Sequence, residues 1–269
     1  MTTKLVICDI DATLVNEKKE LTPRTKKNLI QLHEKGIYFG IASGRPADEL
    51  KRNKEYWDLP FDFDFVVGMN GAELWDGVHQ KFYSYFMMKK EWLKETMEIM
   101  KVVKCNPMIY WNGKIRCVHI DDWMIHSAST SHKELEVVKL EDFYAHENAK
   151  IMFRMKEEDM PKAEAWVKEH PNPYYHGFKT QSTLLEFCDK RINKGYGLKK
   201  ICELNDLDIK DVMAFGDTSN DNDMLKVAGC GVCMINGTDD TKACANAITK
   251  QDNDHDGLAI YLEESGILC

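Results

Sequence analysis

Residues 4–13 read KLVICDIDAT, and this stretch decides the fold. Residues 5–8 form a short β-rich apolar run, which is typical of a buried strand, and the run stops where acidic residues begin. A helix is expected next, with Thr22 as its N-cap and Gly36 at its end. A second strand is expected at residues 37–42. This strand–helix–strand order predicts parallel neighbours in a doubly wound sheet.

The sequence pattern changes from about residue 70. Asp76-Gly77 and Asn112-Gly113 each lie between two strand-like runs, and both dipeptides favour β-hairpins. Two helical stretches and two further strand-like runs belong to the same region, at residues 89–104, 160–169, 150–155 and 183–188. Strands joined by hairpins, together with helices, predict an antiparallel α+β module.

Alternating strands and helices return after Lys190, with a helix at residues 194–203 and a strand at residues 212–215. The simplest interpretation is one α/β core with an inserted α+β cap. We expect residues 1–84 and 186–269 to form the core and residues 85–185 to form the cap.

Composition narrows the possible functions. The formal charge of -8, from 44 acidic and 36 basic residues, argues against general affinity for nucleic acid. No apolar run approaches the roughly 20 residues that cross a bilayer, and the first run is too short for a signal peptide. Nine scattered cysteines suit free thiols in a reducing compartment. A cytoplasmic protein is expected, with no membrane or nucleic-acid partner and no evident protein partner.

Asp9 and Asp11 come directly after the first strand. Open α/β proteins bind ligands at this carboxyl edge of the sheet, and residues two apart in an extended segment face the same way. Two neighbouring carboxylates repel each other unless a cation neutralises them, and an all-oxygen site suits Mg²⁺. The alternative is a polar turn after a strand.

Two further signals point to an anion at the same edge. Ser43-Gly44-Arg45 follows the second strand, where a hydroxyl beside glycine can form a phosphate cradle, although Ser-Gly is also an ordinary turn. Lys194 lies at the expected start of a helix, where its ammonium and the helix N–H groups both favour an anion. Alone, such a lysine is usually solvated.

The fourth signal is the segment GDTSND at residues 216–221. It follows a strand and leads into a helix, so Asp217 and Asp221 lie at a strand end where they can bind the same metal or hold its ligands. Acidic residues at a helix start can also serve only as caps.

As an ordered set, these four segments resemble the motifs of the haloacid dehalogenase-like phosphatases, and more narrowly their Cof-type branch. The resemblance covers essentially the whole chain. It implies a Rossmann-like parallel-sheet core with an inserted α+β cap, and a magnesium-dependent phosphatase that acts on a small phosphorylated metabolite through an aspartyl-phosphate.

The resemblance also implies a role for each motif residue. Asp9 is the nucleophile, Asp11 the acid and base, and Lys194 the catalytic cation. Mg²⁺ is bound by Asp9, by Asp217 and by the backbone carbonyl of Asp11, so the Asp11 carboxyl is expected to be free to carry a proton. Asp221 supports Lys194 or the metal. The residues expected to contact the substrate phosphate are Thr13, Ser43, Gly44 and Asn220.

One position departs from the family pattern, which has glycine where this chain has Ala12. The methyl group costs little unless φ is positive there. Two other functions stay open on the sequence alone. One is a phosphomutase or phosphotransferase on the same scaffold, and the other is a binding protein that has lost turnover.

Overall fold

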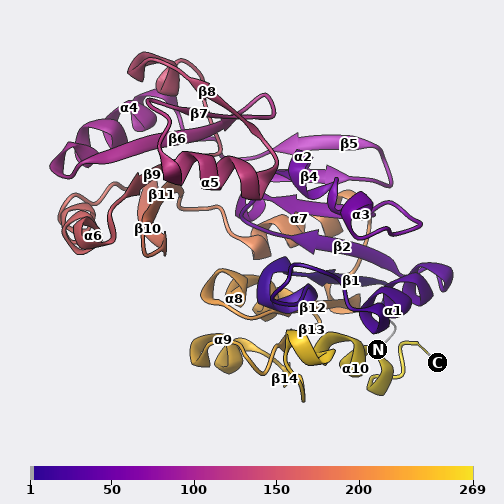
Figure 1. Ribbon diagram of the computed structural model, residues 1–269. Helices are drawn as coiled ribbons and strands as arrows, with labels where there is room; N and C mark the ends of the chain where they lie inside the picture. Colours follow the sequence, from indigo (N-terminus) through magenta and orange to yellow (C-terminus); the bar gives the residue numbers. More distant parts are fainter. Residues whose placement is uncertain (1–2, 269) are drawn as a thin grey trace. The chain divides into compact units, whose positions relative to one another are not determined.

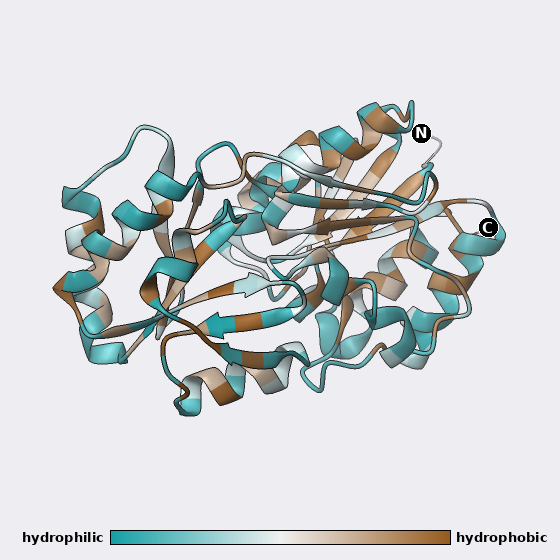
Figure 2. Cartoon of the chain, turned by 90° about the horizontal axis from the view of Figure 1, so that it is seen from above, coloured by the Kyte–Doolittle hydropathy of each residue, from teal (hydrophilic) through white to brown (hydrophobic). Residues whose placement is uncertain are grey.

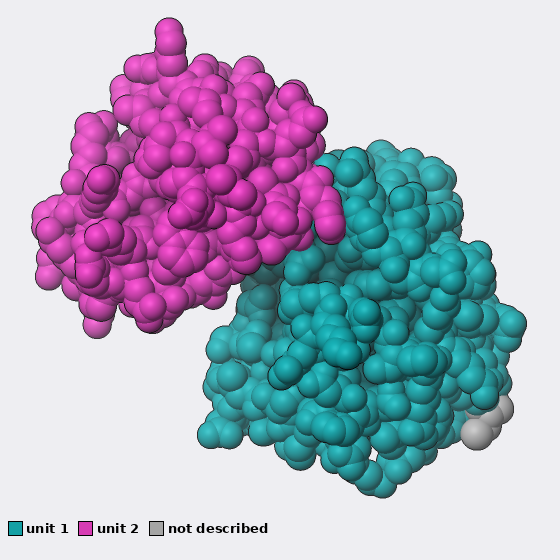
Figure 3. All heavy atoms as spheres, viewed as in Figure 1, with its two compact units in different colours: residues 1–83, 193–269 teal, residues 84–192 magenta. Residues whose placement is uncertain are grey.

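The computed structural model describes residues 3–268. The chain divides into two compact units, which are coloured separately in Figure 3. The first unit takes in the chain as far as Tyr83 and again from Asn193, and the second unit is Ser84–Ile192. Among the described residues, no helix is both long enough and apolar enough to cross a membrane.

The first unit is built on an eight-stranded sheet with the strand order β14-β13-β12-β1-β2-β3-β4-β5 (Figure 1). The pairs from β14 through to β3 are parallel, and β4 runs antiparallel to β3. In chain order the strands are β1 (Leu5–Cys8), β2 (Tyr38–Ala42), β3 (Phe65–Gly68), β4 (Glu73–Asp76), β5 (Lys81–Ser84), β12 (Val212–Gly216), β13 (Cys230–Cys233) and β14 (Ala247–Ile248).

Helices cover both faces of this sheet. The helices are α1 (Pro23–Glu34), α2 (Ala47–Leu50), α3 (Asn53–Tyr56), α7 (Lys194–Leu204), α8 (Asn222–Val227), α9 (Asp239–Cys244) and α10 (Gly257–Glu264). Thr22 caps α1 by accepting a hydrogen bond from the Thr25 N–H, as its position before Pro23 predicts. The α/β fold with a parallel-sheet core is therefore confirmed.

Strand β1 is buried on both sides, as a central parallel strand must be. Val6 and Cys8 pack in one cluster with Leu29 of α1 and Leu262 of α10. Leu5 and Ile7 are equally buried. In Figure 2 brown, hydrophobic stretches run along several of the strands. Because all four residues of β1 are buried and apolar, the first polar side chain available to a ligand is that of Asp9, directly after the strand.

The second unit has its own six-stranded sheet, in the order β10-β11-β9-β6-β7-β8. Its strands are β6 (Cys105–Trp111), β7 (Lys114–Cys117), β8 (Glu134–Val137), β9 (Lys150–Met155), β10 (Tyr175–Gln181) and β11 (Leu184–Asp189), and its helices are α4 (Lys90–Ile99), α5 (Asp122–Ser131) and α6 (Met160–Glu169). Asn112 and Gly113 both have positive φ in the tight turn between β6 and β7. A β-hairpin there was predicted, and it is confirmed.

Two expectations need correction. The predicted boundary at residues 185/186 falls inside β11, which pairs with β9 and β10, so the second unit extends to Ile192. The helix expected at residues 89–104 ends at Ile99 and continues as a short 3-10 turn. The hairpin around Asp76-Gly77 lies in the sheet of the first unit, because β4 pairs with β3, and this agrees with the expected core of residues 1–84.

Candidate active site

Asp9 marks the point where β1 ends. Its backbone N–H still donates to the Phe215 carbonyl of β12 over 2.9 Å, and the chain then turns sharply through residues 10–14. The carboxyl group is consequently fixed at the carboxyl edge of the sheet, between β2 and β12, and the residue is only 8% exposed.

Lys194 brings three distant parts of the chain together. Its Nζ donates to Asp9 Oδ1 over 2.5 Å and to Asp221 Oδ1 over 2.6 Å. Asn193 caps α7 immediately before it, which directs the lysine from the first turn of the helix. Burial acts to lower the pKa of Lys194, but the two carboxylates outweigh it and raise the pKa above its usual value. The buried ammonium is thus held in its charged form.

Asp221 uses its second oxygen to hold the loop after β12. Asp221 Oδ2 accepts from the backbone N–H of Asp217 over 3.0 Å and from that of Thr218 over 3.1 Å. A Cβ at Gly216 would lie 2.5 Å from the Asp221 Cβ, so only glycine fits at that position. Asp221 therefore positions both Lys194 and Asp217.

Asp9, Asp217 and Asp221 form a carboxylate cluster, with one oxygen of each within 4.8 Å of the others. Burial raises the pKa of Asp9 to about 8, although Lys194 opposes the shift. Burial also raises the pKa of Asp217 to about 6, against a hydrogen bond from Thr13. These carboxylates resist ionisation because they are crowded together, and a divalent cation would relieve their repulsion. Mg²⁺ fits such a site because it prefers hard oxygen ligands.

Thr13 and Ala12 complete the turn after β1. Thr13 Oγ1 donates to Asp217 Oδ1 over 2.8 Å and is buried, so it orients the carboxylate and is partnered before any substrate binds. Ala12 has φ +60 and ψ +9, which is the left-handed region. The absence of the usual glycine therefore has an energetic cost here.

Asp11 lies outside the carboxylate cluster and has its own partners. Its carboxylate accepts from Lys19 Nζ over 2.7 Å and from Arg45 Nη2 over 2.8 Å. Burial acts to raise the pKa of Asp11, but Arg45 and Lys19 together lower it. The Asp11 carboxyl is thus ion-paired with two cations in this structure, and its expected role as acid and base stays a prediction. Arg45 lies within the quoted Ser43-Gly44-Arg45 segment, whereas no sequence signal marks Lys19.

Ser43 and Gly44 follow β2 at the same edge of the sheet. The Ser43 N–H donates to the Val67 carbonyl over 2.8 Å, and its hydroxyl accepts from the Arg45 N–H over 3.3 Å. Asn220 is exposed and accepts a hydrogen bond from Thr218 Oγ1 over 2.8 Å. Asn220 thus lies on the exposed side of the loop whose Asp221 is fully buried.

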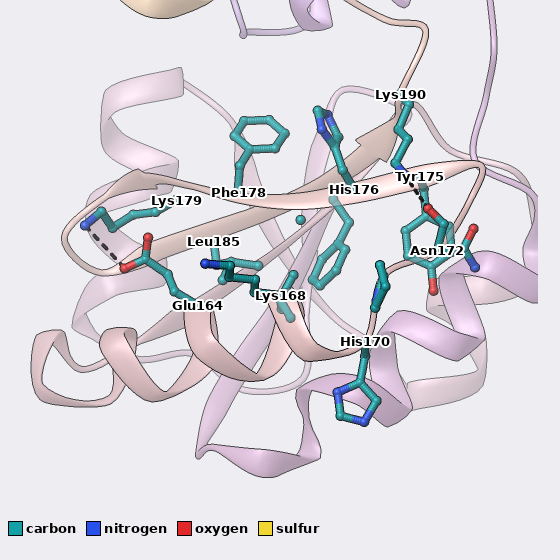
Figure 4. Close-up of a pocket in the computed structure, with 14 residues that line it drawn as sticks. Glu164, Lys168, His170, Asn172, Tyr175, His176, Phe178, Lys179, Leu185 and Lys190 are labelled. Carbon is teal, nitrogen blue, oxygen red and sulfur yellow. Dashed lines mark hydrogen bonds and ion pairs between the residues drawn. The ribbon is translucent and has the colours of Figure 1, made fainter.

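A separate cavity of about 640 Å³ lies in the second unit, between α6 and the edge strand β10 (Figure 4). Aromatic and aliphatic side chains such as Phe187 and Leu185 line it together with Lys168 and Lys190. Lys179, also in the lining, pairs with Glu164 over 3.4 Å. None of the predicted site residues contributes to this cavity.

The first unit thus combines a parallel-sheet core with a cluster of carboxylates at the carboxyl edge of that sheet. A family model described as haloacid dehalogenase-like hydrolase matches residues 6–262. The chain belongs to this family, and the resemblance found in the sequence is confirmed.

The relatives agree with this assignment. The chain is 26% identical over 270 residues to the Bacillus subtilis 5-amino-6-(5-phospho-D-ribitylamino)uracil phosphatase YitU, covering 97% of this chain and 96% of the relative. It is 29% identical to a second B. subtilis phosphatase of the same description, YcsE, with coverages of 95% and 93%. The prediction of an enzyme of this family is confirmed.

Solved structures share the whole fold. A haloacid dehalogenase-like hydrolase from Bacteroides thetaiotaomicron superposes with a TM-score of 0.87 at 25% identity, covering 98% of this chain and all of the other. A sugar phosphatase of haloacid dehalogenase subclass IIB gives a TM-score of 0.82 at 22% identity, with coverages of 98% and 100%. At that identity the second match establishes the fold alone.

Proposed function

We propose that this protein is a magnesium-dependent phosphatase that hydrolyses a small phosphorylated metabolite through a phospho-aspartate on Asp9. The observation that carries the proposal is the contact of Asp9 with Lys194 beside Asp217 and Asp221. A nucleophilic carboxylate, a fixed cation and a metal-binding carboxylate cluster are the parts that phosphoryl transfer needs. The phosphatase names of the relatives support the same reaction.

In the first step, an oxygen of Asp9 forms a bond to phosphorus while the bond from phosphorus to the ester oxygen breaks. The departing oxygen takes a proton from Asp11, and the alcohol leaves. Lys194 remains beside Asp9 throughout, so its charge stabilises the negative charge on the transferring group. Covalent catalysis divides one difficult displacement into two easier ones.

In the second step, water attacks the phosphorus and the bond to the Asp9 oxygen breaks, which releases inorganic phosphate. Asp11 accepts the proton of the attacking water. Lys19 and Arg45 favour the carboxylate form of Asp11, and this is the form that the second step requires. Protonating the leaving group in the first step therefore calls for a rearrangement of these two ion pairs.

Mg²⁺ would be held by Asp9, Asp217 and the backbone carbonyl of Asp11, with Asp221 in support. Bound there, it supplies positive charge that stabilises the transferring phosphoryl group. The residues proposed to bind the phosphate oxygens are Ser43, Gly44, Asn220 and Thr13. Thr13 already donates to Asp217, so we assign it mainly to orienting that carboxylate.

The substrate is proposed to be a small phosphate monoester in the cytoplasm. Two relatives are named for 5-amino-6-(5-phospho-D-ribitylamino)uracil, so this compound comes first in a panel of phosphorylated metabolites that includes sugar phosphates. The second unit is proposed to act as the cap that selects the substrate. Free thiols support a reducing compartment, since the eight cysteines in the described part of the chain are all unpaired.

The decisive experiment is rapid-quench trapping of the phosphoenzyme. Asp9→Asn should form none. Asp11→Asn should still be phosphorylated by p-nitrophenyl phosphate, whose leaving group needs no acid, but should lose the phosphate slowly. Asp239→Asn is a matched control at the exposed first residue of α9 and should behave as wild type. Phosphoenzyme in Asp9→Asn, mapped to another residue, would overturn the mechanism.

A further inference from the structure

The segment Met69-Asn70-Gly71, directly after β3, has an unusual backbone. Its three consecutive residues have φ values of +49, +55 and +110. Asparagine tolerates the left-handed region better than most residues, but methionine does not. A run of such residues persists only where the surroundings impose it, and strain of this kind is concentrated at functional sites.

This segment touches two of the site's motifs. On one side, the Met69 N–H donates to the Arg45 carbonyl over 2.8 Å and the Asn70 N–H donates to the Ser43 carbonyl over 3.0 Å. On the other side, a Cβ at Gly71 would lie 2.4 Å from the carbonyl oxygen of Asn193. Since Asn193 is the residue before Lys194, the segment joins the Ser43 loop to the start of α7.

The Asn70 side chain has a role that the backbone alone does not explain. Glycine could adopt the same φ and form the same two backbone hydrogen bonds. The carboxamide lies against Gly44, where a Cβ would be 3.4 Å from both Nδ2 and Oδ1 of Asn70. Its Oδ1 is buried without a hydrogen-bond partner, which is unfavourable. The carboxamide is therefore placed by its packing against Gly44 and not by a hydrogen bond to its Oδ1.

We propose that Asn70 is a positioning residue of the phosphate-binding site. Its carboxamide packs against Gly44 and so fixes the direction of the Gly44 N–H and the Ser43 hydroxyl, while its backbone keeps this loop in register with Lys194. The inference rests on the proposed function, because it assigns Ser43 and Gly44 to the substrate phosphate.

The test compares Asn70→Gly and Asn70→Asp with wild type. Asn70→Gly removes the carboxamide but suits the left-handed backbone, so the melting temperature should change little. Asn70→Asp keeps both the shape and the left-handed tolerance, and adds a negative charge. The measurements are the inhibition constant of inorganic phosphate, KM, kcat and the melting temperature. Asp206→Gly is the control, because Asp206 also has positive φ (+52) but lies in the turn after α7.

We expect the inhibition constant for phosphate and KM to rise about tenfold in Asn70→Gly, as for one hydrogen-bonding group that loses its alignment. Phosphate binding should be weaker still in Asn70→Asp, because a carboxylate repels the phosphate. If Asn70 served only the turn, the opposite would be expected, and Asn70→Asp would have a KM and a phosphate inhibition constant close to those of wild type.

The possible failures are distinguishable. Wild-type protein that hydrolyses no phosphate ester and binds no phosphate contradicts the proposed function itself. An active wild type with unchanged phosphate inhibition in both Asn70 variants contradicts only the role of Asn70. A loss in Asp206→Gly equal to that in Asn70→Gly would also overturn this role, since it would make the effect one of backbone flexibility.

Discussion

The Lys194 ammonium lies 2.6 Å from the Asp221 carboxylate, and both side chains are completely shielded from solvent. Because the same nitrogen also binds Asp9, one buried cation serves two buried carboxylates. Removing water from these charges is expensive, so each depends on the others. Asp221 thereby keeps Lys194 beside the proposed nucleophile even when no substrate is bound.

Lys194→Met should lower the free energy of unfolding by about 3–5 kcal/mol, because it leaves buried carboxylates without their cation. The double variant Lys194→Met/Asp221→Asn should lose less than the sum of the two single variants, by about 1–3 kcal/mol. Urea denaturation measures all three. Lys199→Met, an exposed position on the same helix, is the control. Simple additivity would contradict the coupling.

Magnesium should stabilise the protein through the carboxylate cluster. At a concentration 100 times its dissociation constant, the gain is about 2.7 kcal/mol, seen as a higher melting temperature. Asp217→Asn should remove most of this gain, and EDTA should abolish turnover. Asp239→Asn should retain both the stabilisation by magnesium and the turnover. Full activity after exhaustive chelation would show that the cluster has been misinterpreted.

Thr13→Val should weaken magnesium binding by about 10–100-fold, because Asp217 loses the hydrogen bond that orients it. Thr13→Ser keeps the hydroxyl and should keep most of the affinity. Titration calorimetry compares the three proteins. Equal affinity in Thr13→Val and wild type would limit Thr13 to a packing role.

Ala12→Gly should stabilise the protein by about 0.5–1 kcal/mol. The left-handed conformation of Ala12 costs about 1–2 kcal/mol, and the greater freedom of glycine in the unfolded chain offsets part of the gain. Ala72→Gly makes the same change at φ -75 and should destabilise instead. Thermal unfolding of both variants measures this difference in sign.

A fragment of residues 84–192 should fold by itself. It holds a complete six-stranded sheet and its own apolar cluster, which includes Phe153, Phe187 and Leu93. Circular dichroism should show a cooperative denaturant transition for the fragment. A featureless, gradual transition would mean that this unit depends on the rest of the chain.

Much of the fold follows from local sequence. Helix α6 begins and ends where predicted, because Pro161 fixes its first turn and apolar residues recur at helical spacing. Helix α5 was not predicted, since its sequence DWMIHSASTS is rich in residues with low helix propensity. Packing of Met124 and capping by Asp121 stabilise it instead. Such tertiary support is invisible in a single sequence.

The candidate site was likewise predictable only where local sequence determines the structure. The strand-end positions of Asp9 and Asp217 could be predicted, because parallel strands bring their carboxyl ends to one edge. The ion pair of Asp11 with Lys19 could not, since it depends on the path of a loop rather than on a repeating pattern. The role proposed for Asn70 could not be predicted either, because its left-handed backbone is apparent only in the structure.

The pairing of β1 with β12 has a consequence for synthesis on the ribosome. Leu5 lies opposite Val212, so the first strand to emerge has an unpaired edge until more than 200 further residues have been translated. The second unit is continuous in sequence and is complete well before β12 appears. At this stage the nascent chain therefore carries an apolar strand with one unpaired edge, together with the second unit, which is expected to fold by itself. This is the stage at which chaperone binding or misassembly is most expected.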